Sequence, residues 1–192
     1  GLVGSEMCIR DRAFGDYYGT YRAMQKALEA GKVRAIGLSN FVDARFVDLV
    51  ENMEVKPAVL QLETHVFSQQ KRMRELMAPY GTRLMAWAPL AEGRNGIFTH
   101  PTLTVIGAKY GKTAAQTALR FLMAEDVIAI PKSVHRERLV ENFSIDDFEL
   151  SAEDLDAIRA LDGGKPMFAD FNDPTLAKFL LEYDAKFNPE RQ

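Results

Sequence analysis

The sequence predicts an α/β fold in which helices cover a parallel sheet. A predicted helix comes first and four strand–helix units follow it. Parallel neighbours need crossover connections of about a dozen residues, which the predicted helices provide. Polar residues follow the carboxyl ends of the strands, where such folds bind ligands. Two architectures fit: an open doubly wound sheet, and part of an eight-stranded barrel, which usually has roughly 250 residues.

Helical periodicity and short apolar runs place the individual elements. Tyr21, Met24 and Leu28 recur at helical spacing, so residues 17–30 should form a helix that Gly31 ends. The strands are expected at 33–38, 59–64, 84–88 and 127–130. The other helices are expected at 43–51, 68–78, 103–110, 113–124, 136–142, 155–161 and 174–187.

Composition excludes several classes of protein. The 192 residues suit one domain or a large piece of one. With 24 Lys and Arg against 27 Asp and Glu, the chain has no general attraction for nucleic acid or anionic membranes. No apolar run approaches the roughly 20 residues that span a bilayer. Cys8, the single cysteine, excludes an internal disulfide framework and a multi-cysteine metal site. We therefore expect a cytoplasmic protein.

Residues 1–12 differ from the rest of the chain. They lack clean periodicity and an initiator Met, and they resemble translated library-adaptor sequence. We expect a non-native or disordered leader there, with a native disordered N-terminus as the alternative. The predicted domain therefore comprises residues 13–192.

A cluster of polar residues stands where the last predicted strand turns into a helix. Pro131 ends the strand, and Lys132 and Ser133 occupy the turn before a helix that carries Arg138. A helix start offers unpaired N–H groups and partial positive charge, so this junction favours a phosphate. The alternative is a solvated basic helix start, because no glycine-rich phosphate loop is present.

Three ordered motifs resemble those of the aldo-keto reductase family: Gly31–Phe41, Gln61–His65 and Ile130–Asn142. The resemblance covers about residues 14–163, and the segment Ala86–Leu90 looks closest to bacterial 2,5-diketo-D-gluconate reductases. It implies a (β/α)8 TIM barrel, of which residues 13–192 would hold roughly strands 5 to 8, their helices and a C-terminal helix and tail. It also implies reduction of a small aldehyde or ketone by a nicotinamide cofactor.

For the nicotinamide end of that cofactor, the resemblance implies four residues. Ser39, Asn40 and Gln61 would hydrogen-bond the carboxamide, which needs both donors and acceptors. Trp87 would stack on the ring, although it could equally be a core aromatic residue.

For the phosphates, the resemblance implies a loop and a basic cluster. Leu90 and the loop that contains Glu92 would lie over the pyrophosphate. Lys132, Ser133 and Arg138 would bind a 2′-phosphate, for which a guanidinium fork is suited.

The adenine side would be formed by Glu141 and Asn142. His135 stands where relatives often carry another basic residue, and Glu92 adds a negative charge near the pyrophosphate. The resemblance implies NADPH as the cofactor, and NADH is the alternative because both of these residues would weaken phosphate binding.

The proton-donating tyrosine, lysine, aspartate and histidine of the family have no matching positions here. Tyr17 and Tyr18 lie in a predicted helix, and His65 and His100 are expected to be structural. We therefore assign no catalytic residue and no metal site, and we expect this chain alone to be inactive.

Exposed sheet edges at 33–38 and 127–130 would favour self-association of the chain, whereas a full-length protein is expected to be a monomer.

Two other functions fit fewer of the residues: a non-catalytic cofactor-binding or regulatory module of the same fold, and a phosphate-binding barrel enzyme of unrelated chemistry. Met167, Phe168 and Phe171 would either line a substrate pocket or anchor the tail.

Overall fold

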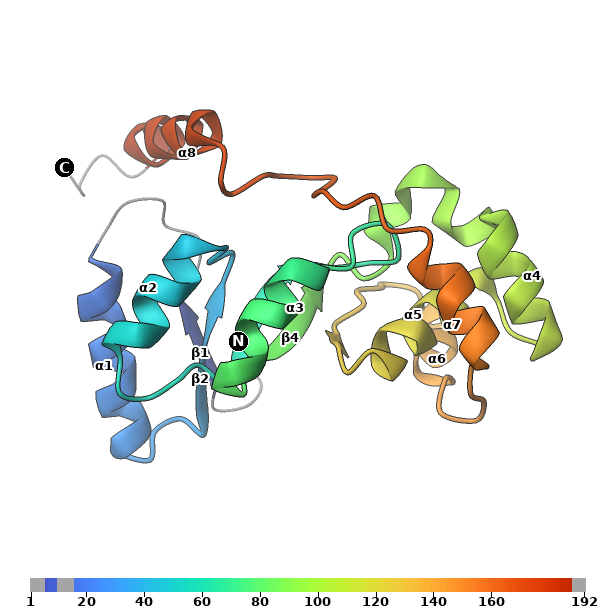
Figure 1. The fold of residues 1–192 in the computed structure, drawn as a ribbon, viewed down its shortest axis with the longest axis horizontal. Coiled ribbons are helices and arrows are strands. Elements are labelled where there is room, and N and C mark those ends of the chain that lie inside the picture. Colours follow the sequence, from blue (N-terminus) through green and yellow to red (C-terminus); the bar gives the residue numbers. More distant parts are fainter. Residues whose placement is uncertain (1–5, 10–15, 188–192) are drawn as a thin grey trace. The chain divides into compact units, whose positions relative to one another are not determined.

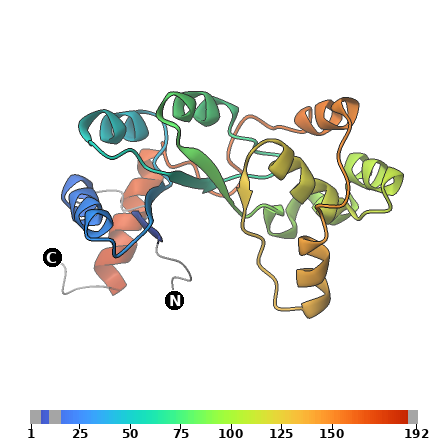
Figure 2. The ribbon, with the colours of Figure 1, turned by 90° about the horizontal axis from the view of Figure 1, so that it is seen from below.

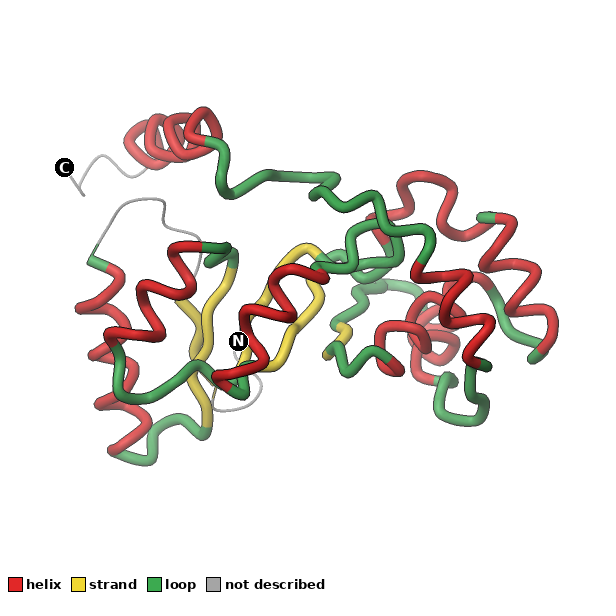
Figure 3. The backbone as a smooth tube through the Cα atoms, viewed as in Figure 1, coloured by secondary structure: helices red, strands yellow, loops and turns green. Residues whose placement is uncertain are grey.

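The computed structural model describes residues 6–9 and 16–187 (Figures 1 and 3). The chain divides into two compact units. The first unit comprises residues 1–61, 72–83 and 168–192, and the second comprises residues 62–71 and 84–167.

The first unit is built on parallel strands. Strand β1 (Glu6–Ile9) pairs with β2 (Ala35–Ser39), which pairs with the start of β3 (Val59–Glu63), a strand whose last two residues, Leu62 and Glu63, are counted in the second unit. The registers include Glu6 opposite Ala35 and Ser39 opposite Gln61. Its helical elements are α1 (Tyr17–Glu29), α2 (Ala44–Asn52), α3 (Lys71–Met77), the 3-10 helix η1 (Ala78–Tyr80) and α8 (Pro174–Phe187).

Helix α1 forms as predicted and packs against β2 (Figure 2). Asp16 begins the helix by accepting a hydrogen bond from Gly19 N, and Gly31 follows its end at φ +66°. Only glycine adopts that backbone conformation without strain. Tyr21 is fully buried on the inner face, and its hydroxyl donates to Val55 O.

Strand β1 corrects two expectations. Four strands were predicted, and the described residues contain five because Glu6–Ile9 is extended. The 33–38 segment was expected to leave an open edge, yet β1 pairs along β2. The unpaired N–H and C=O groups of an edge strand can form hydrogen bonds with another extended segment. The periodicity of the sequence does not show which segment that will be. The remainder of the predicted leader, residues 1–5 and 10–12, lies outside the described residues.

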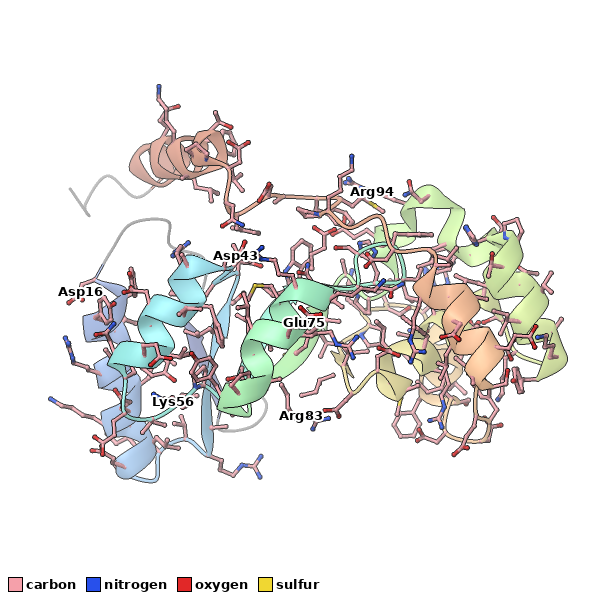
Figure 4. All side chains as sticks on the ribbon, viewed as in Figure 1. Asp16, Asp43, Lys56, Glu75, Arg83 and Arg94 are labelled. Carbon is pink, nitrogen blue, oxygen red and sulfur yellow. The ribbon has the colours of Figure 1, made fainter. Side chains whose placement is uncertain are left out.

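The turn after β2 is fixed by Asp43, which is labelled in Figure 4. Asp43 lies at φ +47° and accepts hydrogen bonds from Arg72 Nε and Asn172 Nδ2, each at 2.6 Å. Its backbone N–H contacts Met73 Sδ at 3.2 Å. Residues of α3 and of the segment before α8 therefore hold the start of α2.

The second unit contains strand β4 (Arg83–Trp87) paired in parallel with β5 (Ile128–Ala129). Its helical elements are η2 (Ala91–Thr99), α4 (Pro101–Lys109), α5 (Ala114–Ala124), α6 (Arg136–Phe143) and α7 (Ala152–Arg159). Strand β5 is shorter than predicted because Val127 N still bonds to Leu122 O at the end of α5. Helix α3 starts later than predicted because His65 and Ser68 bond to each other across a tight turn.

Helices α4 and α5 approach closely at Gly107. A Cβ atom there would lie 2.5 Å from Lys112 O and 2.7 Å from Thr117 Oγ1. Thr113 caps α5 in a capping box with Gln116. The inner face of α5 is buried and contributes Leu119 to the hydrophobic core.

Helix α7 is fastened to α4 by a buried carboxylate. Asp154 is 2% exposed and accepts hydrogen bonds from Lys109 Nζ at 2.5 Å and Tyr110 Oη at 2.6 Å. Burial alone would raise the pKa of Asp154, but hydrogen bonds from Lys109, Tyr110 and Ser151 outweigh it and lower the pKa to about 2.

Among the described residues, no helix combines the length and apolar character needed to cross a membrane.

Candidate functional site

A pocket of about 500 Å³ lies in the second unit, at the junction predicted to bind phosphate. It is bordered by the loop after β4, the start of α5 and the turn from β5 into α6. The residues that line it are Leu90, Phe98, Thr113, Ala115, Lys132, Ser133, Val134, His135, Arg138, Glu141 and Asn142. Six of these were predicted from the sequence to contact the cofactor.

The basic side of the pocket consists of Lys132, His135 and Arg138. Neither Lys132 nor Arg138 forms a salt bridge with any described residue, so both charges are available to an anion. Ser133 Oγ accepts from His135 N at 3.1 Å, which fixes the turn into α6. His135 precedes the first residue of α6 and provides no side-chain cap, so the first-turn N–H groups add positive potential.

The acidic side of the pocket is tied to α5. Glu141 Oε1 accepts from Thr113 Oγ1 at 2.6 Å. Gln116 Nε2 donates to Glu141 O at 3.2 Å and to Ser144 O at 3.0 Å. The capping box of α5 therefore also holds the C-terminal half of α6.

The loop after β4 has an unusual backbone. Ala91, Glu92 and Asn95 have positive φ angles of 49°, 49° and 52°. Leu90 and Phe98, at either end of this segment, line the pocket, whereas Glu92 is exposed and is not a lining residue. Its carboxylate lies 3.9 Å from Arg94 Nη2.

The residues predicted for the nicotinamide end are divided between the units. In the first unit, Ser39 and Asn40 lie at the carboxyl end of β2, with Gln61 beside them on β3. Asn40 N donates to Gln61 O at 2.9 Å, and Asn40 adopts φ +58°. Trp87 ends β4 in the second unit, where its carbonyl accepts from Thr64 N. Each unit thus brings together its own share of the predicted residues.

His65 and Glu63 form a buried pair in the second unit. His65 is fully buried, with Nε2 3.1 Å from Glu63 Oε1 and Nδ1 accepting from Phe67 N. Glu63 Oε1 also accepts from Met167 N at 2.5 Å. These contacts agree with a structural role for His65, and they anchor Met167.

His100, Tyr17 and Tyr18 also contact other side chains of the protein. His100 precedes α4 and packs against the Phe67 ring. Tyr17 and Tyr18 both donate to Asp48 Oδ2, and the hydrogen bond to Asp48 raises the pKa of Tyr17 and brings that of Tyr18 to about 12. No group of three or more potential metal ligands occurs within residues 6–9 and 16–187.

Phe98, Thr113, Ala115 and Val134 line the pocket but were not singled out in the sequence. The Thr113–Gln116 spacing marks a capping box, which was the only available signal for Thr113. Its hydrogen bond to Glu141 joins residues 28 positions apart and depends on tertiary packing.

Comparisons with known proteins agree with the motifs. The model of the aldo/keto reductase family matches residues 11–163. Glyoxal reductase of Bacillus subtilis is 42% identical over 145 residues, which are 76% of this chain and 52% of that protein. The chain spans about half the length of the curated relatives it matches.

Solved structures agree as well. An aldo-keto reductase from a Medee basin deep-sea metagenome library has a TM-score of 0.83 and 36% identity, covering 90% of this chain and 66% of that one. An aldo-keto reductase complexed with NADPH has a TM-score of 0.78 and 28% identity, covering 88% of this chain and 58% of that one. The predicted TIM-barrel type of α/β fold is therefore supported.

Proposed function

Because the chain belongs to the aldo/keto reductase family, we propose that it carries the cofactor-binding part of an NADPH-dependent reductase of small aldehydes or ketones. The observation that carries this proposal is the basic pocket between β5 and α6. The similarity to a glyoxal reductase and to a structure complexed with NADPH supports the same reaction and cofactor. Assignment to the 2,5-diketo-D-gluconate subgroup stays a prediction from the motif spacing.

The 2′-phosphate of NADPH would occupy the basic side of the pocket. Lys132 supplies a point charge, Arg138 a planar fork of donors and Ser133 a hydroxyl. The start of α6 adds its N–H groups. NADH lacks the dianion that would satisfy these donors, so NADPH is favoured over NADH.

The resemblance to the family assigns the other parts of the cofactor to the remaining predicted residues. Glu141 and Asn142 would face the adenine, and Leu90 with the Glu92 loop would cover the pyrophosphate. Ser39, Asn40 and Gln61 would fix the carboxamide, while Trp87 packs on the ring. Bound NADPH supplies the hydride for carbonyl reduction.

We assign no proton donor to this chain and expect it to have no carbonyl reductase activity by itself. Tyr17 and Tyr18 are engaged by Asp48, and hydrogen bonding to that carboxylate raises the pKa of both phenols. Turnover of glyoxal with NADPH by the purified chain would contradict this expectation.

Isothermal titration calorimetry with two small probes tests the phosphate site. Adenosine 2′,5′-bisphosphate should bind at least about 10-fold more tightly than adenosine 5′-monophosphate, which lacks the 2′-phosphate. Arg138→Ala should weaken the bisphosphate by about 10- to 100-fold and leave the monophosphate nearly unchanged. Equal affinities for the two probes, or no binding of either, would overturn the proposal.

Arg136→Ala is the matched control for this experiment. Arg136 is an exposed arginine of the same helix but does not line the pocket. Its removal lowers the overall positive charge by the same amount, so it separates a local contact from general electrostatic attraction. The control should retain the affinity of the unmodified chain.

A further inference from the structure

The irregular segment η2 carries an asparagine that is followed by glycine. Asn95 and Gly96 are both exposed and have φ angles of 52° and 61°. The other asparagines of the chain precede Phe, Met, Asp or Pro, so Asn95 is the one with glycine after it. Because glycine has no side chain, the backbone nitrogen of Gly96 is unusually accessible to the Asn95 amide.

The side chain of Asn95 is also less restrained than those of other exposed asparagines. Asn52 Nδ2 donates to Asp48 O at 2.8 Å, and Asn172 Nδ2 donates to Asp43 Oδ2 at 2.6 Å. The Asn95 side chain makes no hydrogen bond to any described residue. Its carboxamide can therefore rotate toward the following backbone nitrogen.

The pair Asp162–Gly163 has the same spacing but is held in place. Asp162 Oδ1 accepts from Gln69 N at 3.1 Å and from Gly164 N at 3.2 Å. The backbone nitrogen of Gly163 donates to Phe67 O at 2.9 Å. Both the carbonyl carbon that would be attacked and the nitrogen that would attack are thus immobilised at this pair, in contrast to Asn95–Gly96.

We propose that Asn95 is a site of spontaneous modification through a cyclic imide. The backbone nitrogen of Gly96 gives up its proton and bonds to Cγ of Asn95, the bond from Cγ to the side-chain nitrogen breaks, and ammonia leaves. Water then adds to either carbonyl of the five-membered ring and opens it to aspartate or isoaspartate. No oxidant or reductant takes part in either step.

Ring closure requires rotation about the backbone of Asn95, whose ψ angle is 27°. A residue with a Cβ atom is less stable in the left-handed region than in the right-handed or extended regions. The conformational preference of Asn95 itself therefore does not oppose this rotation, and Gly96 tolerates the accompanying change.

The isoaspartate product alters the segment that carries Phe98 to the pocket. Ala91 and Ile97 are fully buried and anchor this segment, and isoaspartate adds one carbon to the main chain between them. A Cβ atom on Gly93 would lie 3.2 Å from Phe98 Cε2, so the ring packs closely on the same segment. A longer main chain changes that packing.

Peptide mapping by mass spectrometry of the full chain, incubated at mildly alkaline pH, tests the modification. The peptide with Asn95 should convert to aspartate and isoaspartate at least about 10-fold faster than those with Asn52 or Asn172. Asp162 should stay unchanged in the folded chain and begin to isomerise in urea. Asn95→Gln, in which the ring would need six members, should abolish the conversion.

Two results would overturn the proposal. One is conversion of Asn95 no faster than that of Asn52 or Asn172. The other is conversion in urea but not in the folded chain, which would mean that the fold protects this residue.

Hydrogen exchange tests the effect on the segment. The isoaspartate form should exchange the amides of Ile97, Phe98 and Thr99 faster than the unmodified chain does. Asn95→Asp is the matched control, because it adds the charge without the extra carbon and should exchange like the unmodified chain. Equal exchange in all three forms would contradict the effect on Phe98.

Discussion

The two groups of predicted cofactor residues are built in different ways. Ser39 and Asn40 are 4% and 7% exposed and belong to the interior of the first unit. Lys132 and Arg138 are exposed on the second unit and make no salt bridge to a described residue. Residues of the first group therefore contribute to folding as well as to any ligand contact, whereas those of the second are available almost entirely for binding.

The largest expected effect is on the stability of the first unit. Asn40→Val places a β-branched side chain at φ +58° in a buried position. We expect the free energy of unfolding to fall by about 2–4 kcal/mol, measured by urea denaturation. Asn40→Gly is the matched control, because glycine adopts this conformation without strain. Equal stabilities of the valine variant and the unmodified chain would show that this strand end is not constrained.

The next effect concerns Asp154, the buried carboxylate that joins α7 to α4. The pKa of Asp154 is lowered from 3.8 to about 2, so its ionised form is favoured by folding. Its stabilising contribution is complete above the unfolded pKa of 3.8 and is lost as the pH falls through about 2. Urea midpoints of the unmodified chain should therefore decline over this range more steeply than those of Asp154→Asn. Parallel pH profiles would contradict this role for Asp154.

The smallest effect is expected at Glu92. Its side chain is 59% exposed and does not line the pocket. Glu92→Gln should change the affinity for adenosine 2′,5′-bisphosphate by less than about 2-fold, because solvent screens exposed charges. A gain of tenfold in calorimetry would mean that the loop after β4 approaches the phosphates of the ligand.

Local patterns predicted most of the helices and strands and the turn at Lys132, whereas Leu90, Glu141 and Asn142 of the pocket were predicted through the family resemblance. The 17–30 helix followed from its apolar spacing and Gly31, and the turn at Lys132 followed from a β-branched run ended by Pro131. These signals work because helix ends, turns and strand ends depend on neighbouring residues.

Features that depend on distant residues escaped prediction. Strand β1 is defined by its pairing with β2, about 30 residues away, and its sequence has no clean alternation. Phe98 reaches the pocket through an irregular loop whose backbone was not predictable. Glu92 was placed over the cofactor by resemblance, and that placement stays a prediction.

The most direct test of the basic pocket is the phosphorus NMR spectrum of adenosine 2′,5′-bisphosphate titrated with the full chain. The two phosphates give separate signals, so the spectrum identifies the one that the protein contacts. We predict that the 2′-phosphate signal shifts most, and that this shift is lost with Arg138→Ala and kept with Arg136→Ala. A shift confined to the 5′-phosphate, or no shift of either signal, would contradict the account.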